Sequence, residues 1–348
     1  MIRVLLVDDS PSVRAVLRRF FAKTPDFQVV GEAADGKQAV AAVLAVEPHV
    51  VVMDLLMPVM DGYEAIQGIM AVRPTPIVVL SSRANRNQMQ TAFEAMRRGA
   101  LEVLPKPEDT ASWEQLAESL PATLRAVAEA RAQPLAARPR PARRTAVSGG
   151  MESAAPVELR YVAIGASTGG PAAIRELLLE IPVDVPVSLL IVQHIAAGFE
   201  VGFADWLNKE FPHDVRLARD GEQPRPGEVR LAPGGSHLLL EADGILRLDS
   251  GTPARRGHRP AVDELFFSCA RSCPQQVAGV ILTGMGADGA EGLLALRQAG
   301  GLTLAQDEAS SVVFGMPRVA LERGAADVAL PPRELARELV RAFRKEAR

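Results

Sequence analysis

The sequence predicts an α/β protein made of two doubly wound domains, each with a parallel sheet. Short β-branched runs alternate with helical patterns over residues 1–130 and again from Tyr161 to about Leu330, and this alternation is typical of βαβ units. The length of 348 residues suits two domains. Between them, residues 133–150 are rich in proline and arginine and contain no acid. We therefore expect one domain at 1–120, a linker at 121–157 and a second domain at 158–348.

Each expected strand is a short apolar run, and right-handed crossovers should join the strands within each sheet. In the first domain the strands are Val4–Val7, Gln28–Ala33, Val50–Met53, Ile77–Leu80 and Glu102–Leu104. In the second domain they are Tyr161–Ile164, Ser188–Val192, Val277–Leu282 and Leu302–Ala305, with a β-hairpin at His237–Glu241 and Ile245–Leu248 and a terminal helix at Pro331–Arg348.

Composition excludes several classes of protein. Apolar residues make up 48% and charged residues 23%, as in soluble globular chains. No apolar run is long enough for a spanning helix or a signal peptide, so the expected location is cytoplasmic. A net charge of −3 gives no global positive field for nucleic acid or anionic lipid. Cys269 and Cys273 are the only cysteines and are expected to be small core residues. The arginines of the linker could contact an acidic partner, although a solvated spacer is favoured.

Three carboxylates follow strands of the first domain. Asp8 and Asp9 come directly after the first strand, and Asp54 ends the third. Because the carboxyl ends of parallel strands meet at one edge of the sheet, these acids should cluster there and bind Mg²⁺. Ser81 ends the fourth strand and Lys106 the fifth, which adds a hydroxyl and a positive charge to the same edge. A single aspartate at a strand end is more often a helix cap, but the joint spacing favours phosphoryl transfer to a carboxylate.

These residues lie in the segments VDDS, MDLLMPVMDG around Asp54, SSR at Ser81 and LPKP at Lys106. Together they resemble the response-regulator receiver domain, which has a flavodoxin-like fold. The resemblance implies that Asp54 accepts phosphate from a histidine kinase, that Asp8, Asp9 and Asp54 hold Mg²⁺, and that Ser81 and Lys106 sense the phosphate. Val103 stands where family members often carry an aromatic switch residue.

The second domain opens with a strand, a glycine-rich turn and a helix start. Gly165, Ser167 and Gly169 match G-x-S-x-G, a pattern that exposes a serine near helix-start amides. His194 follows the next strand, and Asp288 follows another. Three strand ends thus supply a nucleophile, a base and a carboxylate to orient the base, as in a serine triad.

Other interpretations exist for each part of this set. A glycine-rich turn after a strand often binds phosphate or closes a tight corner. The run Gly284-x-Gly286-x-x-Gly289 also matches a dinucleotide-binding fingerprint, with Asp307 at about the expected distance. Dinucleotide binding is disfavoured because the carboxylate of Asp288 would face the negatively charged pyrophosphate. Too little chain also follows this segment to complete a dinucleotide-binding half. The remaining histidines are expected to be surface or packing residues: His49, His213, His237 and His258.

The second domain and the receiver together resemble the CheB family of protein-glutamate methylesterases. The matching segments are IGASTGGP, IVQHIAAGF, RLAPGGSHL, GHRPAVDELF, LTGMGADGA and QDEASSVVFGMP. The resemblance implies a Rossmann-like catalytic domain in which Ser167 is the nucleophile, His194 the general base and acid, and Asp288 its orienting partner. Thr168 and Met285 would line the site. Departures from the common pattern are Ile195-Ala196, Glu200 and Ala287.

The resemblance further implies hydrolysis of glutamate methyl esters on methyl-accepting chemoreceptors, with release of methanol, and deamidation of receptor glutamines. The expected partners are cytoplasmic receptor helices and the kinase, with no nucleic acid and no membrane insertion. Mg²⁺ would serve the receiver, and ester hydrolysis would need no cofactor. The family also implies that the unphosphorylated receiver obstructs the catalytic serine. The alternatives are a receiver whose output is binding alone, which a missing triad residue would favour, and a nicotinamide-dependent oxidoreductase.

Overall fold

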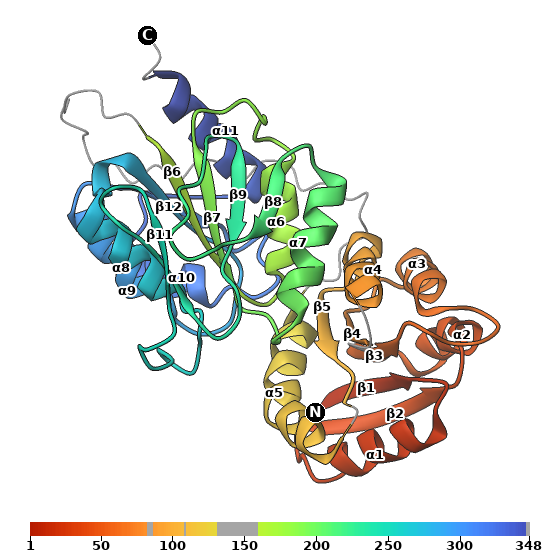
Figure 1. The fold of residues 1–348 in the computed structure, drawn as a ribbon. Coiled ribbons are helices and arrows are strands. Elements are labelled where there is room, and N and C mark those ends of the chain that lie inside the picture. Colours follow the sequence, from red (N-terminus) through yellow and green to blue (C-terminus); the bar gives the residue numbers. More distant parts are fainter. Residues whose placement is uncertain (82–85, 108, 131–158, 346–348) are drawn as a thin grey trace. The chain divides into compact units, whose positions relative to one another are not determined.

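The computed structural model describes residues 1–81, 86–107, 109–130 and 159–345, and the chain divides into two compact units, Met1–Arg140 and Pro141–Arg348 (Figure 1). Each unit is built around one large parallel sheet. Most of the predicted linker, residues 131–157, lies outside the described residues, and the last helix of the first unit continues to Glu129. The predicted domain limits therefore stay a prediction. Within the described ranges, no helix is long and apolar enough to cross a membrane.

The first unit contains a five-stranded sheet in the order β2-β1-β3-β4-β5. Every strand predicted for it is present, longer by one or two residues. The strands are β1 (Ile2–Val7), β2 (Phe27–Ala33), β3 (Val50–Asp54), β4 (Ile77–Ser81) and β5 (Glu102–Pro105). The helices are α1 (Pro11–Phe21), α2 (Gly36–Val46), α3 (Gly62–Val72), α4 (Arg86–Arg98) and α5 (Thr110–Glu129).

Two helical layers cover this sheet. Val4 and Leu6 of β1 share a buried cluster with Leu17 of α1 and Leu120 of α5, so these two helices lie on one face. Helix α2 packs on β1 and α4 packs on β4 and β5, with α3 in contact with both helices (Figure 1). The chain reverses direction across the sheet between β1 and β3, and this places their carboxyl ends beside each other.

The second unit contains a seven-stranded parallel sheet in the order β14-β13-β12-β6-β7-β9-β8 and an antiparallel hairpin, β10-β11. The predicted fold class is thus confirmed for both units. The strands are β6 (Tyr161–Ala166), β7 (Ser188–Gln193), β8 (Asp214–Leu217), β9 (Glu228–Leu231), β10 (His237–Leu240), β11 (Leu246–Asp249), β12 (Val277–Ile281), β13 (Leu302–Gln306) and β14 (Val328–Leu330). The helices are α6 (Gly170–Leu178), α7 (Phe199–Glu210), α8 (Val262–Ser272), a 3₁₀ turn η1 (Pro274–Gln276), α9 (Ala290–Gln298), α10 (Met316–Glu322) and α11 (Pro332–Lys345).

The connectivity of this sheet determines where a site can form. After β6 the chain builds β7, β8 and β9 on one side, then crosses over to build β12, β13 and β14 on the other. The carboxyl ends of β6, β7 and β12 therefore meet where the strand order reverses, the usual position of a site in an open α/β sheet.

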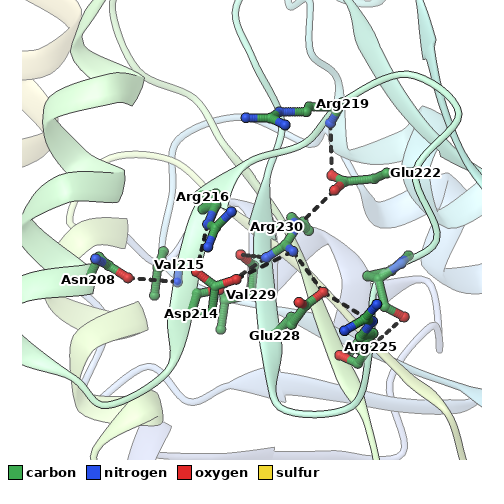
Figure 2. A network of polar contacts seen from close by, with 12 residues as sticks. Asn208, Asp214, Val215, Arg216, Arg219, Glu222, Arg225, Glu228, Val229 and Arg230 are labelled. Atoms are coloured by element: carbon green, nitrogen blue, oxygen red, sulfur yellow. Dashed lines mark hydrogen bonds and ion pairs between the residues drawn. The ribbon is translucent and has the colours of Figure 1, made fainter.

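Strands β8 and β9 were absent from the sequence-based prediction because polar residues make up much of each (Figure 2). Arg230 explains how they are buried. Its side chain is 6% exposed, and its guanidinium lies 2.7 Å from Glu228, 3.2 Å from Glu222 and 3.6 Å from Asp214. It also donates hydrogen bonds to the carbonyls of Asp214 and Val229. A buried arginine therefore ties together the edge strand β8, its neighbour β9 and the loop between them. The third strand missed, β14, has only three residues.

Candidate functional site

The turn after β6 presents Ser167 at the carboxyl edge of the second sheet. The Ser167 N–H donates to the Thr283 carbonyl at 3.0 Å, and its own carbonyl accepts from the N–H of Gly170 and from the Gln193 side chain, both at 2.8 Å. Gly169 has a φ of 77°, and a Cβ atom on Gly170 would lie 1.9 Å from the Gln193 side-chain oxygen. The glycines are thus required for the chain to turn from β6 into α6 beside Gln193.

His194 reaches the same edge from the neighbouring strand. In the parallel pairing of β6 with β7, Ala166 lies opposite Gln193, and the His194 N–H donates to the Ala166 carbonyl at 2.9 Å. The Gln193 side chain donates to the carbonyl of His194 as well as to that of Ser167, both at 2.8 Å. Ser167 and His194 are therefore connected through backbone atoms and one buried amide.

Asp288 holds the ring of His194 at one edge. The His194 Nε2 atom lies 2.8 Å from Asp288 Oδ2, and the side chains are 8% and 2% exposed. The Asp288 carboxylate also accepts from the first two N–H groups of α8, Val262 at 2.7 Å and Asp263 at 3.0 Å. Burial raises the pKa of Asp288, but the hydrogen bond and charge of His194, together with these N–H groups, outweigh it and lower the pKa overall. Asp288 is therefore an anion at neutral pH.

The contact with Asp288 selects one tautomer of His194. When Nε2 carries the proton and donates it to the carboxylate, Nδ1 of the neutral ring is unprotonated and can accept a proton. The Nδ1 atom is buried and has no hydrogen-bond partner among the described residues, and no hydrogen bond joins the Ser167 hydroxyl to it there. Contacts of this kind often tighten only when substrate binds.

Thr168 and Met285, the predicted lining residues, lie on the two segments that flank Ser167. Thr168 follows Ser167 directly, and its carbonyl accepts from the Thr283 hydroxyl at 3.0 Å. A Cβ atom on Gly284 would lie 2.7 Å from that of Ser167, so the segment that carries Met285 passes directly over the serine turn. The Met285 side chain is 43% exposed. The segment after β12 thus supplies Asp288 and an accessible apolar side chain.

His258 lies at this site although the sequence analysis gave it no role. Its ring stacks on that of His194, with centroids 3.7 Å apart and planes inclined by 6°. Burial, and then the charge of His194, lower the pKa of His258 to about 4, against the opposing charge of Asp288. The one available signal was the position of His258 in GHRPAVDELF, because a loop after a hairpin gives no periodic pattern. Of the other three histidines, His213 and His237 are buried and His49 is exposed.

The predicted acid cluster of the first unit is assembled at the carboxyl ends of β1 and β3. One carboxylate oxygen from each of Asp8, Asp9 and Asp54 lies within 4.8 Å of the others. Lys106 Nζ lies 2.5 Å from Asp54 and 2.8 Å from Asp8. Ser81 is 6% exposed, and its carbonyl accepts from the Lys106 N–H at 2.7 Å. All five predicted residues therefore lie on adjoining strand ends.

The charges in this cluster are mutually dependent. Burial raises the pKa of Asp8 and the charge of Asp54 adds to this, while Lys106 offsets part of the rise. For Lys106, burial lowers the pKa, but its hydrogen bonds to Asp54 and Asp8 outweigh burial and raise it. Three acids with one lysine leave excess negative charge, and carboxylate oxygens are the ligands that a hard cation such as Mg²⁺ prefers. Val103, at the position of the expected aromatic switch, is 3% exposed within β5.

Comparison with known proteins decides the family. The family model for CheB methylesterase matches residues 162–339, and that for the response regulator receiver domain matches residues 4–118. The chain belongs to the CheB methylesterase family. It is therefore an enzyme, a chemotaxis hydrolase that carries a response-regulator receiver domain. The alternative of a dinucleotide-binding oxidoreductase is excluded, and the segment Gly284–Gly289 supplies the carboxylate partner of His194 instead.

CheB relatives match over nearly the full chain. A protein-glutamate methylesterase/protein-glutamine glutaminase 2 from Anaeromyxobacter dehalogenans is 45% identical and covers 97% of this chain and 96% of its own. A protein-glutamate methylesterase/protein-glutamine glutaminase 4 from Geobacter metallireducens is 41% identical, and the match covers 95% of this chain and 96% of the relative. The solved CheB methylesterase catalytic domain of Thermotoga maritima is 37% identical, with a TM-score of 0.51, and covers 53% of this chain and 99% of its own.

Proposed function

We propose that this CheB protein hydrolyses methyl esters of glutamate on the cytoplasmic helices of methyl-accepting chemoreceptors and deamidates receptor glutamines. The observation that carries the proposal is the 2.8 Å contact between His194 and Asp288 beside the Ser167 turn. The names of the relatives, which join the two activities, support the substrates. Both reactions are acyl transfers from a glutamyl carbonyl, so one nucleophile and one base can perform both.

In the proposed reaction, the Ser167 hydroxyl attacks the ester carbonyl while His194 Nδ1 takes its proton. The same proton passes to the departing methoxy oxygen, which leaves as methanol, and the glutamyl group stays on Ser167 as an ester. Water then attacks this acyl-serine, with His194 again accepting and returning a proton, and glutamate is released. With a glutamine substrate the first leaving group is ammonia.

Asp288 orients the base in this scheme. Its bond to Nε2–H keeps the proton off Nδ1 in the resting ring and stabilises the imidazolium that forms when Nδ1 accepts a proton. The helix-start amides of Val262 and Asp263 hold the carboxylate in place. Thr168 and Met285 flank the serine and contribute to the wall that receives the glutamyl side chain.

The receiver is proposed to control this activity. Asp54 accepts a phosphoryl group from a chemotaxis histidine kinase, and Lys106 and Ser81 contact the phosphate. Asp8, Asp9 and Asp54 would hold Mg²⁺, which offsets negative charge during phosphoryl transfer. Lys106 contacts Asp54 and Asp8 in the unphosphorylated cluster, so a new phosphate would change its partners. The unphosphorylated receiver is proposed to limit access of the receptor helix to Ser167.

Methanol release from methylated receptor membranes, measured with and without a small phosphodonor, tests the proposal. Ser167→Ala should lower the rate by about 10³-fold or more, because only binding and oxyanion contributions remain. Ser250→Ala is the control, since Ser250 is an exposed serine of the same unit. Turnover in Ser167→Ala close to that of Ser250→Ala would exclude the serine mechanism.

A further inference from the structure

The imidazole of His194 is fixed on two sides. At its edge, Nε2 contacts Asp288 at 2.8 Å. On its face, the His258 ring lies parallel to it, with centroids 3.7 Å apart and planes 6° from parallel. A single hydrogen bond at Nε2 leaves the ring free to rotate about that contact, and a flat group against one face removes this freedom.

His258 is itself held in place by the loop that carries it. Arg255 and His258 exchange two backbone hydrogen bonds, of 3.0 and 2.8 Å, across a turn in which Arg256 and Gly257 have φ values of 51° and 85°. Arg255 pairs with Glu264 of α8 at 2.5 Å, and Arg256 pairs with Glu291 of α9 at 2.7 Å. The turn is therefore anchored to both helices, and α8 is also the helix whose first N–H groups hold Asp288.

The charge state of His258 suits a position against a catalytic base. His194 and Asp288 are the titratable groups that act on it, and burial is the largest influence, so that its pKa falls to about 4. The ring is neutral at neutral pH. A neutral aromatic face tolerates a positive charge on the adjacent imidazole, whereas a second cation would oppose it.

We propose that His258 is a positioning residue, whose ring packs on the face of His194 and holds that imidazole in the plane that directs Nδ1 toward the Ser167 turn. This inference rests on the function proposed above. It assigns His258 no proton transfer. Its contribution is the fixed orientation of the base, which acts on kcat and leaves substrate binding unchanged.

Three substitutions in the full-length protein test this role. His258→Phe keeps a flat ring without titratable nitrogen, His258→Leu keeps apolar bulk without the flat face, and His258→Ala removes both. We expect His258→Phe to retain kcat within about threefold, and His258→Ala to lose about 10- to 100-fold with little change in KM, since small misplacements of a reacting group are costly. His258→Leu should fall between them. The pH profile of kcat/KM should keep its shape in His258→Phe.

Nitrogen-15 NMR of the His194 ring supplies a readout independent of turnover. The native protein and His258→Phe should show one tautomer, with the proton on Nε2, and His258→Ala should show a mixture. His213→Ala is the matched control, because His213 is a buried histidine of the same unit whose ring contacts that of Phe211. It should leave both the His194 spectrum and kcat per folded molecule unchanged.

The outcomes separate the two proposals. Equal losses of kcat in His258→Phe and His258→Ala would mean that His258 takes part in proton transfer. A native kcat and an unchanged His194 spectrum in His258→Ala would mean that His258 has no role. Either result overturns the inference. If Ser167→Ala keeps full activity, the proposed function itself fails, whatever the His258 variants do.

Discussion

Asp288 connects the active site to the helix framework. Helix α8 begins at Val262 after Ala261, a residue with no capping side chain. The Asp288 carboxylate, 26 residues further along the chain, accepts from the Val262 N–H at this buried helix start, as an N-cap side chain would. The orientation of His194 thus depends on where α8 begins. A change at this helix start should alter catalysis as well as stability.

Asp263 lies fully buried beside this arrangement. Burial and the charge of Asp288 raise the pKa of Asp263 to about 6, although the N–H of Gly292, which donates to it at 2.8 Å, opposes the rise. The pKa of an aspartate in an unfolded chain is about 4. Between these values the folded protein binds a proton that the unfolded chain does not. This stabilisation is therefore complete below about pH 4 and is lost as the pH rises through about 6.

Asp263→Asn should flatten this pH dependence, because the amide oxygen still accepts from Gly292 and no charge forms beside Asp288. Between about pH 5 and pH 8, we expect the free energy of unfolding of the native protein to fall by about 1 kcal/mol more than that of the variant. Urea denaturation at each pH measures the difference. Exposed Asp184→Asn is the control and should follow the native curve; an Asp263→Asn curve parallel to it would contradict the prediction.

At the scale of elements, the edge strand β8 and its neighbour β9 depend on Arg230. Arg230→Met would remove two hydrogen bonds to backbone carbonyls and the positive charge shared by Asp214, Glu222 and Glu228. Loss of one partner from a buried ion pair costs about 3–5 kcal/mol. We expect a loss of that size in the free energy of unfolding, measured by urea denaturation. Arg230→Lys should lose less, because lysine keeps the positive charge but lacks the planar guanidinium with its several N–H donors.

Arg216→Met provides the control on the neighbouring strand (Figure 2). Arg216 also pairs with Asp214, at 2.7 Å, but its side chain is 61% exposed. An exposed pair contributes about 0–1 kcal/mol, so this variant should be nearly as stable as the native protein. Equal losses in Arg216→Met and Arg230→Met would show that burial is not what makes the Arg230 network important.

How far the sequence predicts these elements depends on periodicity. The strands rich in Val, Ile and Leu, such as Val50–Asp54 and Ser188–Gln193, are recognisable because burial on both faces gives continuous apolar runs. Strands β8 and β9 are hidden because Arg230 is buried through ion pairs, which leave no apolar pattern. The strand-end residues of the site follow from topology, whereas His258 requires the path of a loop that only tertiary contacts determine.

At the scale of the whole molecule, the proposed control by Asp54 predicts a difference between the full chain and its catalytic part. A fragment that begins near Met151 should release methanol about 5- to 150-fold faster than the unphosphorylated full-length protein, the range of an ordinary coupling free energy. Full-length Asp54→Ala should stay at the low rate when a phosphodonor is added. The assay is methanol release from methylated receptor membranes.

Glu118→Ala serves as the control for substitution in the receiver, because Glu118 is an exposed residue of α5, and it should respond to phosphodonor like the native protein. A fragment no faster than the unphosphorylated full-length protein would mean that the receiver does not obstruct the site. Phosphate would then have to activate by assembling the site or by recruiting the receptor.

The strand order of the catalytic sheet also has a consequence for synthesis on the ribosome. Strands β6 and β7 are made early and pair directly, but β12, the other neighbour of β6, is made much later, and His194 and Asp288 are 94 residues apart in sequence. A nascent chain therefore carries the serine and the histidine for many seconds before the carboxylate emerges, at translation rates of about 5–20 residues per second. On the proposed mechanism, the growing polypeptide has no competent esterase until most of the catalytic unit has been translated.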